Sequence, residues 1–207
     1  VTATSNNSWT ANAGGIAGRV ANSFSVLVMD YTNEIPVTGK YAGGLFGDLA
    51  AEKVVTLNNS GNNAEIKGTS SCAGGLIAAA GSGTVTVENC WNTGAVSTSG
   101  TYIGGLVGTA GDSSLTIQNS LNTGSVTSTN TTNSYVGGLV GLVGVTAQNV
   151  TLTNGANGGA LSGTNCGGLI GSKSASSTVA YTNALYLKRS GGDKAVGNST
   201  TTEPGAI

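Results

Sequence analysis

The stretch YIGGLVGTAGDSSLTIQNSLNTGSV, residues 102–126, decides the fold, because its pattern recurs along the chain. It contains no histidine, lysine or arginine and only one acid, Asp112. Its paired glycines occur six times: GGIAG at 14–18, GGLFG at 43–47, GGLIA at 74–78, GGLVG at 104–108, GGLVG at 137–141 and GGLIG at 167–171. A fixed spacing, here near thirty residues, is the signature of a repeat architecture.

A second block follows each glycine pair of the middle repeats. It reads VTLNNSGNNAEI at 55–66, VTVENCWNTGAV at 85–96, LTIQNSLNTGSV at 115–126 and VTLTNGANGGAL at 150–161. Alignment gives one apolar column (Val55, Val85, Leu115, Val150), a threonine column (Thr56, Thr86, Thr116, Thr151) and a second apolar column (Leu57, Val87, Ile117, Leu152). Apolar and polar residues that alternate with a period of two predict a strand with one buried face.

Asparagines form two further columns. The first holds Asn22, Asn59, Asn89, Asn119, Asn154 and Asn183, and the second, three residues later in the middle repeats, holds Asn62, Asn92, Asn122 and Asn157. Asparagine tolerates left-handed backbone angles and bonds to its own turn, so these columns predict corners. Stacked asparagines can also bond to one another in a ladder. A short strand closes the unit, with Ile66, Val96, Val126 and Leu161 pointing inward.

A unit of two or three short strands cannot enclose a core alone, but it can when stacked on its neighbours. We therefore predict an all-β fold, a parallel β-solenoid (β-helix) of about six coils of ~30 residues, roughly 29 Å long at the strand spacing of sheets. The paired glycines are predicted corners. Because Leu106 and Val107 are adjacent and both apolar, their strand is either covered on both faces or bulged.

The terminal repeats differ from the regular ones. We expect a single solenoid domain over the whole chain, with an atypical N-terminal coil and cap at 1–42, regular coils at 43–180, and a C-terminal cap and tail at 181–207. In the first repeat, the block at 26–40 after Asn22 is interpreted as an insertion. In the last, Lys188, Arg189 and Lys194 would shield the open edge from further pairing. The ends suggest a piece of a longer protein.

The GG-[LI]-x-G units, followed by N-[SC]-x-N-T-G-x-V segments, resemble the GLUG repeat of large secreted and surface-anchored bacterial proteins. Adhesin-like proteins and non-catalytic regions of some immunoglobulin A peptidases carry such repeats. The resemblance covers about residues 13–197, although Ala78 replaces the last glycine of unit three and unit one lacks the asparagine–threonine–glycine turn. It implies an extracellular or cell-surface stalk, adhesin or surface module, with no catalytic residues to carry over.

Composition argues against several function classes. Charged residues make up 8% of the chain and the net charge is −1, against about 25% charged residues in ordinary domains. Such a surface offers no electrostatic footprint for nucleic acid or anionic lipid. No run approaches the ~18 apolar residues that a membrane helix needs, so we expect no membrane insertion of this segment.

The ionisable residues do not predict an enzyme or a metal site. The chain has no histidine, which excludes histidine-based acid–base catalysis and histidine metal ligands. Its nine acids are scattered, and only the pairs Asp30/Glu34 and Asp48/Glu52 lie as close as four residues apart. The turn GTAGDSS at 108–114 offers one carboxylate where calcium needs several. We therefore expect no catalytic, metal-binding or cofactor-binding residues and no enzymatic activity.

The three cysteines are expected to contribute little chemistry. Cys166 falls three coils from Cys72 and Cys90, about 14 Å at the strand spacing of sheets, which is beyond the ~7 Å limit for a disulfide. It shares a column with the apolar residues Ala13, Ala42, Ala73, Ile103 and Val136. This predicts a buried, unpaired thiol. A bond between Cys72 and Cys90 stays open.

Two outward rows are candidate ligand surfaces. Regular threonines on a flat solenoid face can bind ice, but the neighbouring outward row (Asn58, Glu88, Gln118, Thr153) is irregular and partly charged, which makes ice the less favoured ligand. Tyr41, Tyr102 and Tyr135 share one column with Cys72 and Asn165. Aromatic rows can stack on sugars or simply pack at a strand edge.

Together these observations favour a non-enzymatic extracellular structural or adhesive surface module that can form filaments, because few charges oppose association. The alternative is a module of a larger secreted protein that binds carbohydrate or host protein along one face. The expected partners are further copies of the chain in fibres, or a host surface or glycan.

Overall fold

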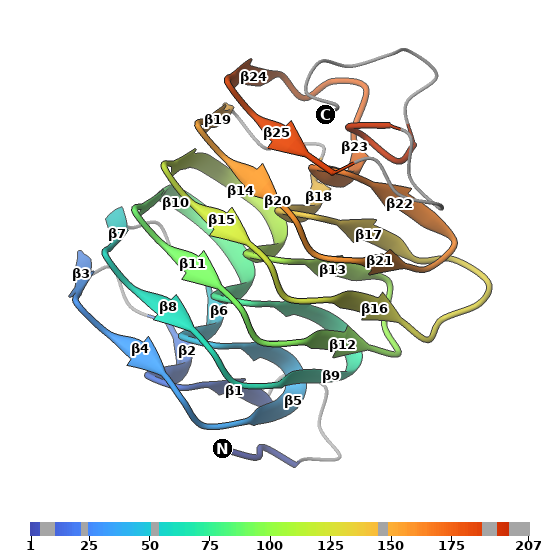
Figure 1. Cartoon of the computed structure of the whole chain (residues 1–207). Helices are drawn as coiled ribbons and strands as arrows, with labels where there is room; N and C mark the ends of the chain where they lie inside the picture. Colours follow the sequence, from blue (N-terminus) through green and yellow to red (C-terminus); the bar gives the residue numbers. More distant parts are fainter. Residues whose placement is uncertain (5–10, 22–24, 51–53, 145–148, 188–193, 199–207) are drawn as a thin grey trace.

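The computed structural model describes residues 1–4, 11–21, 25–50, 54–144, 149–187 and 194–198. Over these residues the chain is all-β, without a helix, and its parallel strands stack coil upon coil from the blue N-terminal end to the red C-terminal end of Figure 1. The register is vertical: Thr86 lies opposite Thr56 on one side and Thr116 on the other. The predicted β-solenoid of about six coils is confirmed.

Three parallel sheets line the solenoid. The first holds the closing strand of each coil and the strand before each glycine pair: β1 (Asn12–Gly14), β5 (Val37–Gly43), β9 (Ile66–Gly74), β12 (Val96–Thr98), β13 (Tyr102–Gly104), β16 (Val126–Ser128), β17 (Tyr135–Gly137), β21 (Leu161–Ser162) and β22 (Asn165–Gly167). The second holds the strands after the glycines and the alternating strands: β2 (Ala17–Val20), β3 (Val26–Met29), β6 (Phe46–Leu49), β7 (Val54–Asn58), β10 (Ile77–Glu88), β14 (Val107–Gln118), β18 (Val140–Val143), β19 (Val150–Thr153), β23 (Ile170–Lys173) and β24 (Val179–Thr182). The third holds one corner strand per coil: β4 (Thr32–Asn33), β8 (Gly61–Asn62), β11 (Trp91–Asn92), β15 (Leu121–Asn122), β20 (Ala156–Asn157) and β25 (Leu185–Tyr186).

We number the coils from one to six, each beginning with the strand before its glycine pair. Both predicted apolar columns of coils two to five point inward, and their side chains are fully buried. Leu106 and Val107 are both buried as well. Their two backbone N–H groups donate to the same carbonyl oxygen, that of Leu139 in the next coil. Two residues that oppose one partner form a bulge, so the bulge alternative explains how two adjacent residues both face the core.

The second asparagine column forms a buried ladder, which we call the inner ladder. Its members are Asn33, Asn62, Asn92, Asn122 and Asn157, each at most 3% exposed. Each Nδ2 from Asn33 to Asn122 donates to the Oδ1 of the next coil's asparagine at 2.7–2.9 Å. The other hydrogen of Asn92 goes to the carbonyl oxygen of Gly94, two residues on. The buried amides therefore have the partners that burial demands.

The second glycine of each pair makes room for the inner ladder. A Cβ atom on Gly105 would collide with the carbonyl oxygen of Gly138 and with the side chain of Asn122. The same relation joins Gly75 to Asn92. In coil six, Tyr186 takes the place of asparagine and packs on Gly168, which ends the ladder.

The first asparagine column forms an exposed ladder at a sharp corner, the outer ladder. Its members have φ between 47° and 53°: Asp30, Asn59, Asn89, Asn119, Asn154 and Asn183. Asn22, which the sequence placed here, lies outside the described residues, and Asp30 holds the position in coil one. Asn59 donates to Asp30 at 2.6 Å and Asn154 to Asn119 at 2.8 Å, whereas Asn89 donates to Asn58, the residue before Asn59, at 3.4 Å.

The interpretation of 26–40 as an insertion is wrong. β3 pairs with β7 in the regular register, with Val26 opposite Val55, and β4 pairs with β8. Coil one is thus a complete coil whose residues differ from the repeat consensus. The backbone pairing that defines the coil does not require those side chains.

Short segments continue the stack at both ends. At the N-terminal end, Thr2 pairs with Thr38 of β5. At the C-terminal end, Val196 pairs with Ile170, and Ala195 and Val196 are fully buried. Residues 194–198 therefore extend the stack beyond coil six, and the C-terminal cap at 181–207 stays a prediction. Lys188 and Arg189 lie outside the described residues.

Candidate functional site

Two outward columns converge across the glycine corner, where the first sheet turns into the second. The column before the glycines holds Asn12, Tyr41, Cys72, Tyr102, Tyr135 and Asn165. The column after them holds Arg19, Asp48, Ala79, Thr109, Leu142 and Ser172. We call the surface between these columns the corner face.

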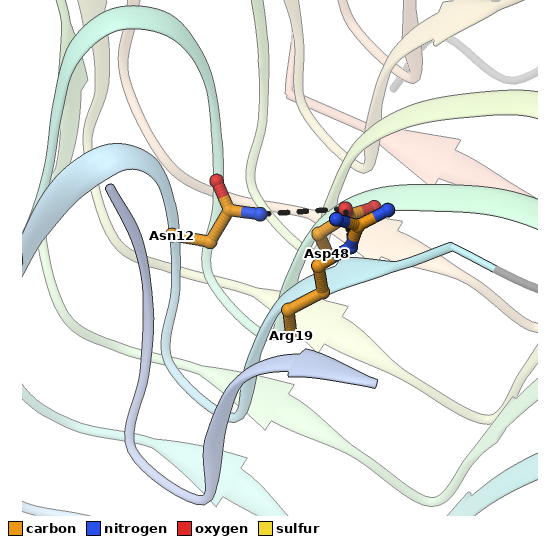
Figure 2. A network of polar contacts seen from close by, with 3 residues as sticks. All are labelled: Asn12, Arg19 and Asp48. Atoms are coloured by element: carbon orange, nitrogen blue, oxygen red, sulfur yellow. Dashed lines mark hydrogen bonds and ion pairs between the residues drawn. The ribbon is translucent and has the colours of Figure 1, made fainter. Parts of the chain in front are cut away.

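Polar contacts show how close the two columns are. Asn12 Nδ2 donates to Asp48 Oδ2 at 3.3 Å, and Arg19 Nε lies 3.2 Å from the same oxygen (Figure 2). Asn12 comes from the first column, whereas Arg19 and Asp48 come from the second. The corner face is therefore concave, because outward side chains of a convex corner would diverge. The sequence does not predict this cluster, because Arg19 and Asp48 follow Asn12 by 7 and 36 residues.

The tyrosines of the first column occupy two different environments. Tyr102 and Tyr135, in adjacent coils, stack with ring centroids 5.8 Å apart and an interplanar angle of 16°. Tyr41 is separated from Tyr102 by the smaller Cys72. Burial, and then the nearby Cys72 thiol, raise the pKa of Tyr41, while a hydrogen bond with the Ser71 side chain opposes the shift.

A hollow of about 280 Å³ lies where the tyrosine column is interrupted. It is lined by Tyr41, Ser70, Ser71, Cys72, Thr101, Tyr102 and Thr109. The adjacent residue of the second column in this coil is Ala79, which is also small. Both columns thus carry small side chains in coil three and larger ones in coils two and four.

The three cysteines are free, and no disulfide joins Cys72 to Cys90. Cys166 lies opposite Val136, as its column predicts, but it is only half-buried because residues 194–198 cover its coil in part. Burial raises the pKa of the Cys166 thiol and, more strongly, that of Cys72, where the Asp48 carboxylate adds to the shift. Such thiols stay protonated at neutral pH and are poor nucleophiles.

The acids link neighbouring coils instead of forming a cluster. Asn63 donates to Glu34 at 2.7 Å, and Asn58 donates to Glu88 at 3.3 Å. Among the residues that the structure describes, no group of three or more histidine, cysteine, aspartate or glutamate side chains could hold a metal ion. The described residues also include no helix that is long and apolar enough to cross a membrane.

The threonine row lies on the second sheet as predicted, in register and half-buried. It is a single regular row. In coil one, Leu27 takes the threonine position, and in coil six Ala180 does. The neighbouring row remains irregular, so the row offers no extended flat array.

A second hollow, of about 310 Å³, lies on the outer face of the third sheet over coil five. Leu121, Leu185 and Leu187 surround it, and the small residues Ala156 and Gly158 form its floor. The three leucines are about 40% exposed. The surface of this hollow is almost wholly apolar, although Thr123 is among its lining residues.

Comparison with known proteins gives one structural neighbour. No protein-family model matches the chain, and no curated protein matches it. The chain resembles the crystal structure of a "putative immunoglobulin A1 protease" from Bacteroides ovatus, with a TM-score of 0.60 and 18% sequence identity. The match covers 94% of this chain and 63% of that chain, less than two thirds of its length. At this identity the likeness concerns the fold alone.

Proposed function

We propose that the chain is a non-enzymatic extracellular structural or adhesive surface module, which acts as a stiff spacer and self-associates. The observation that carries the proposal is the continuous coil-to-coil bonding, in which the inner ladder runs through five coils alongside the backbone ladders. Each coil is tied to its neighbours over all three sheets, which resists bending. The resemblance of the repeat to GLUG arrays supports a location outside the cell.

Coil one offers a surface for self-association. Leu27, Met29 and Ile35 are 56–64% exposed there. Because the chain carries few charges, electrostatic repulsion between copies is weak. Exposed apolar side chains grouped on one coil favour association. Negative-stain microscopy and light scattering of the purified chain are the tests: concentration-dependent filaments are expected, and short rods that never assemble at any concentration would contradict self-association.

The proposal that the module has no enzymatic activity has its own test. The structural neighbour bears the name of an immunoglobulin A1 protease, so the purified chain is incubated with immunoglobulin A1. We expect the heavy chain to remain intact, because the described residues present protonated, buried thiols and dispersed acids. Cleavage that scales with the amount of chain would contradict the proposal.

The alternative function, binding of carbohydrate or host protein along one face, is favoured by one specific observation. This is the hollow of the corner face between Tyr41 and Tyr102, where aromatic and hydroxyl-bearing side chains meet.

A further inference from the structure

We propose that the hollow of the corner face is a binding slot for one neutral pyranose residue of a glycan, held between Tyr41 and Tyr102. This inference goes beyond the structural role, because a spacer needs no such slot. It rests on the interruption of the tyrosine column, on the residues that line the hollow, and on the charge around it.

The spacing of the coils sets the width of the slot. Adjacent coils bring tyrosine rings into direct contact, as Tyr102 and Tyr135 show. Tyr41 and Tyr102 are two coils apart, which corresponds to about 9.6 Å at the usual strand spacing. A ring that contacts both tyrosines at carbon–carbon distances of 3.5–4.0 Å needs about 7–8 Å if it is flat. The extra width suits a puckered sugar ring better than a flat aromatic one.

The floor of the slot is small and apolar. Cys72 lines the hollow between the two tyrosines, and it packs with the buried residues Ala78 and Ala79. Because this coil carries no large outward side chain in either column, its own residues do not fill the space. The residues that bound the hollow come from three consecutive coils, two to four.

Hydroxyl groups surround the apolar walls. Ser70, Ser71, Thr101 and Thr109 line the hollow together with the tyrosines. Ser and Thr hydroxyls can donate and accept, which matches the hydroxyls of a sugar. The Ser71 side chain lies near enough to Tyr41 to lower the pKa of its hydroxyl against the effect of burial. Apolar faces with a few convergent polar groups are the usual composition of a small-ligand site.

The charge around the slot selects neutral ligands. Asp48, although paired with Arg19, still raises the pKa of both Tyr41 and Cys72. No lysine or arginine lines the slot, so no lining side chain would pair with an anionic ligand. Phosphates, carboxylates and sialic acids would be repelled, whereas uncharged hydroxyl groups would not.

The test begins with the purified chain on an array of neutral glycans, sialylated glycans and adenine nucleotides, followed by calorimetry with methyl pyranosides of glucose, galactose, mannose and N-acetylglucosamine. We expect binding to at least one neutral sugar and to none of the anionic probes. Absence of any neutral-sugar signal, or binding of the nucleotides in preference to sugars, overturns the proposal.

Variants then locate the site. Cys72→Tyr should complete the tyrosine column, fill the slot with the protein's own ring and abolish binding, and circular dichroism checks that the variant still folds. Tyr41→Ala should weaken binding about tenfold or more, and Tyr41→Phe by less than about threefold, because the ring is kept. Asn165→Ala is the control in the same column, since Asn165 neither lines the hollow nor lies next to Tyr102, and it should bind like the unmodified chain.

The outcomes separate this proposal from the structural role. Binding that survives Cys72→Tyr, or that falls equally in Tyr41→Ala and Asn165→Ala, overturns the slot. Neither result bears on filament formation or on stiffness, which microscopy reports. A chain that binds the sugar without assembling would retain the slot and contradict only the proposed self-association.

Discussion

The inner and outer ladders use the same amino acid in the same repeat, three residues apart, for different physical reasons. Asn122 of the inner ladder is fully buried, and its amide bonds to both neighbouring coils and to its own turn. Asn119 of the outer ladder is exposed, and its φ is 48°. One position requires a buried amide with all its partners, whereas the other requires a left-handed backbone.

The two ladders therefore differ in the replacements they tolerate. Asp30 shows this at the outer corner, where a carboxylate replaces the amide in coil one and accepts from Asn59. Within the inner ladder, every position from coil one to coil five is asparagine, and Tyr186 appears only where the ladder ends. The inner ladder therefore requires the asparagine side chain, whereas the outer ladder requires the left-handed backbone conformation.

The largest expected effect comes from closing the space on which the inner ladder depends. Gly105→Val should prevent folding or destabilise the chain by more than about 4 kcal/mol, because the new atoms collide with Gly138 and Asn122. Circular dichroism and solubility measure the loss. Gly111→Ala is the control for adding a side chain to the same coil: its Cβ would lie 3.5 Å from the nearest atom, so the change should be within about 1 kcal/mol. Equal damage from both would contradict the role of the glycine.

The next effect is the removal of one rung of the inner ladder. Asn122→Ala leaves the Asn92 donor, the Asn157 acceptor and the Gly124 carbonyl without their partner in the core. Each unsatisfied buried group costs about 1–3 kcal/mol, so we expect a loss of about 3–5 kcal/mol. Guanidinium unfolding, together with hydrogen exchange of the amides in coils three to five, reports both its size and its location. Asn122→Gly should be no better, because backbone freedom supplies no hydrogen bond.

A smaller effect is expected at the outer ladder, where glycine should retain most of the stability that alanine loses. Asn119→Ala should cost about 1–2 kcal/mol, mainly because alanine resists the left-handed conformation. Asn119→Gly should cost less than about 1 kcal/mol, since glycine adopts that conformation freely. The same unfolding assay measures both. If glycine helps at Asn122 but not at Asn119, the assignment of the two ladders is reversed.

The smallest effect is expected away from both ladders. Thr116 lies in the half-buried threonine row, and Thr116→Ser should change stability by about 0.5 kcal/mol or less. A melting curve that overlays the unmodified chain within error is the expected result. A loss comparable to that of Asn122→Ala would show that the row carries an interaction beyond strand packing.

Much of the fold can be predicted from sequence because a stacked repeat places like residues above like. The columns of Val85 and Val87, and the threonine between them, give the register directly. Coil one could not be aligned in this way. Its Asp30 and Leu27 replace the asparagine and threonine of other coils, although the backbone follows the same path. Aligning the repeats by residue type misses a position at which the coils share only a backbone angle.

The corner face shows more clearly what could not be predicted from the sequence. The tyrosine column is visible in the sequence, and so is its interruption at Cys72. The hollow is not, because it needs the second column, which contributes Thr109, to converge on the first across the glycine corner. Whether a corner is concave depends on the bulge and on the direction of the turn, which residue types do not encode in an obvious pattern.

The two ladders also point in opposite directions along the axis. Amides of the inner ladder donate toward the C-terminal end, a sense fixed by Asn62 Nδ2 also donating to the carbonyl of Ala64. Amides of the outer ladder donate toward the N-terminal end, starting from the acceptor-only Asp30. Their dipole moments therefore oppose each other, unlike the aligned peptide dipoles of a helix. Lengthening such an array would add side-chain dipoles of both senses along the axis, rather than dipoles of one sense as in a helix.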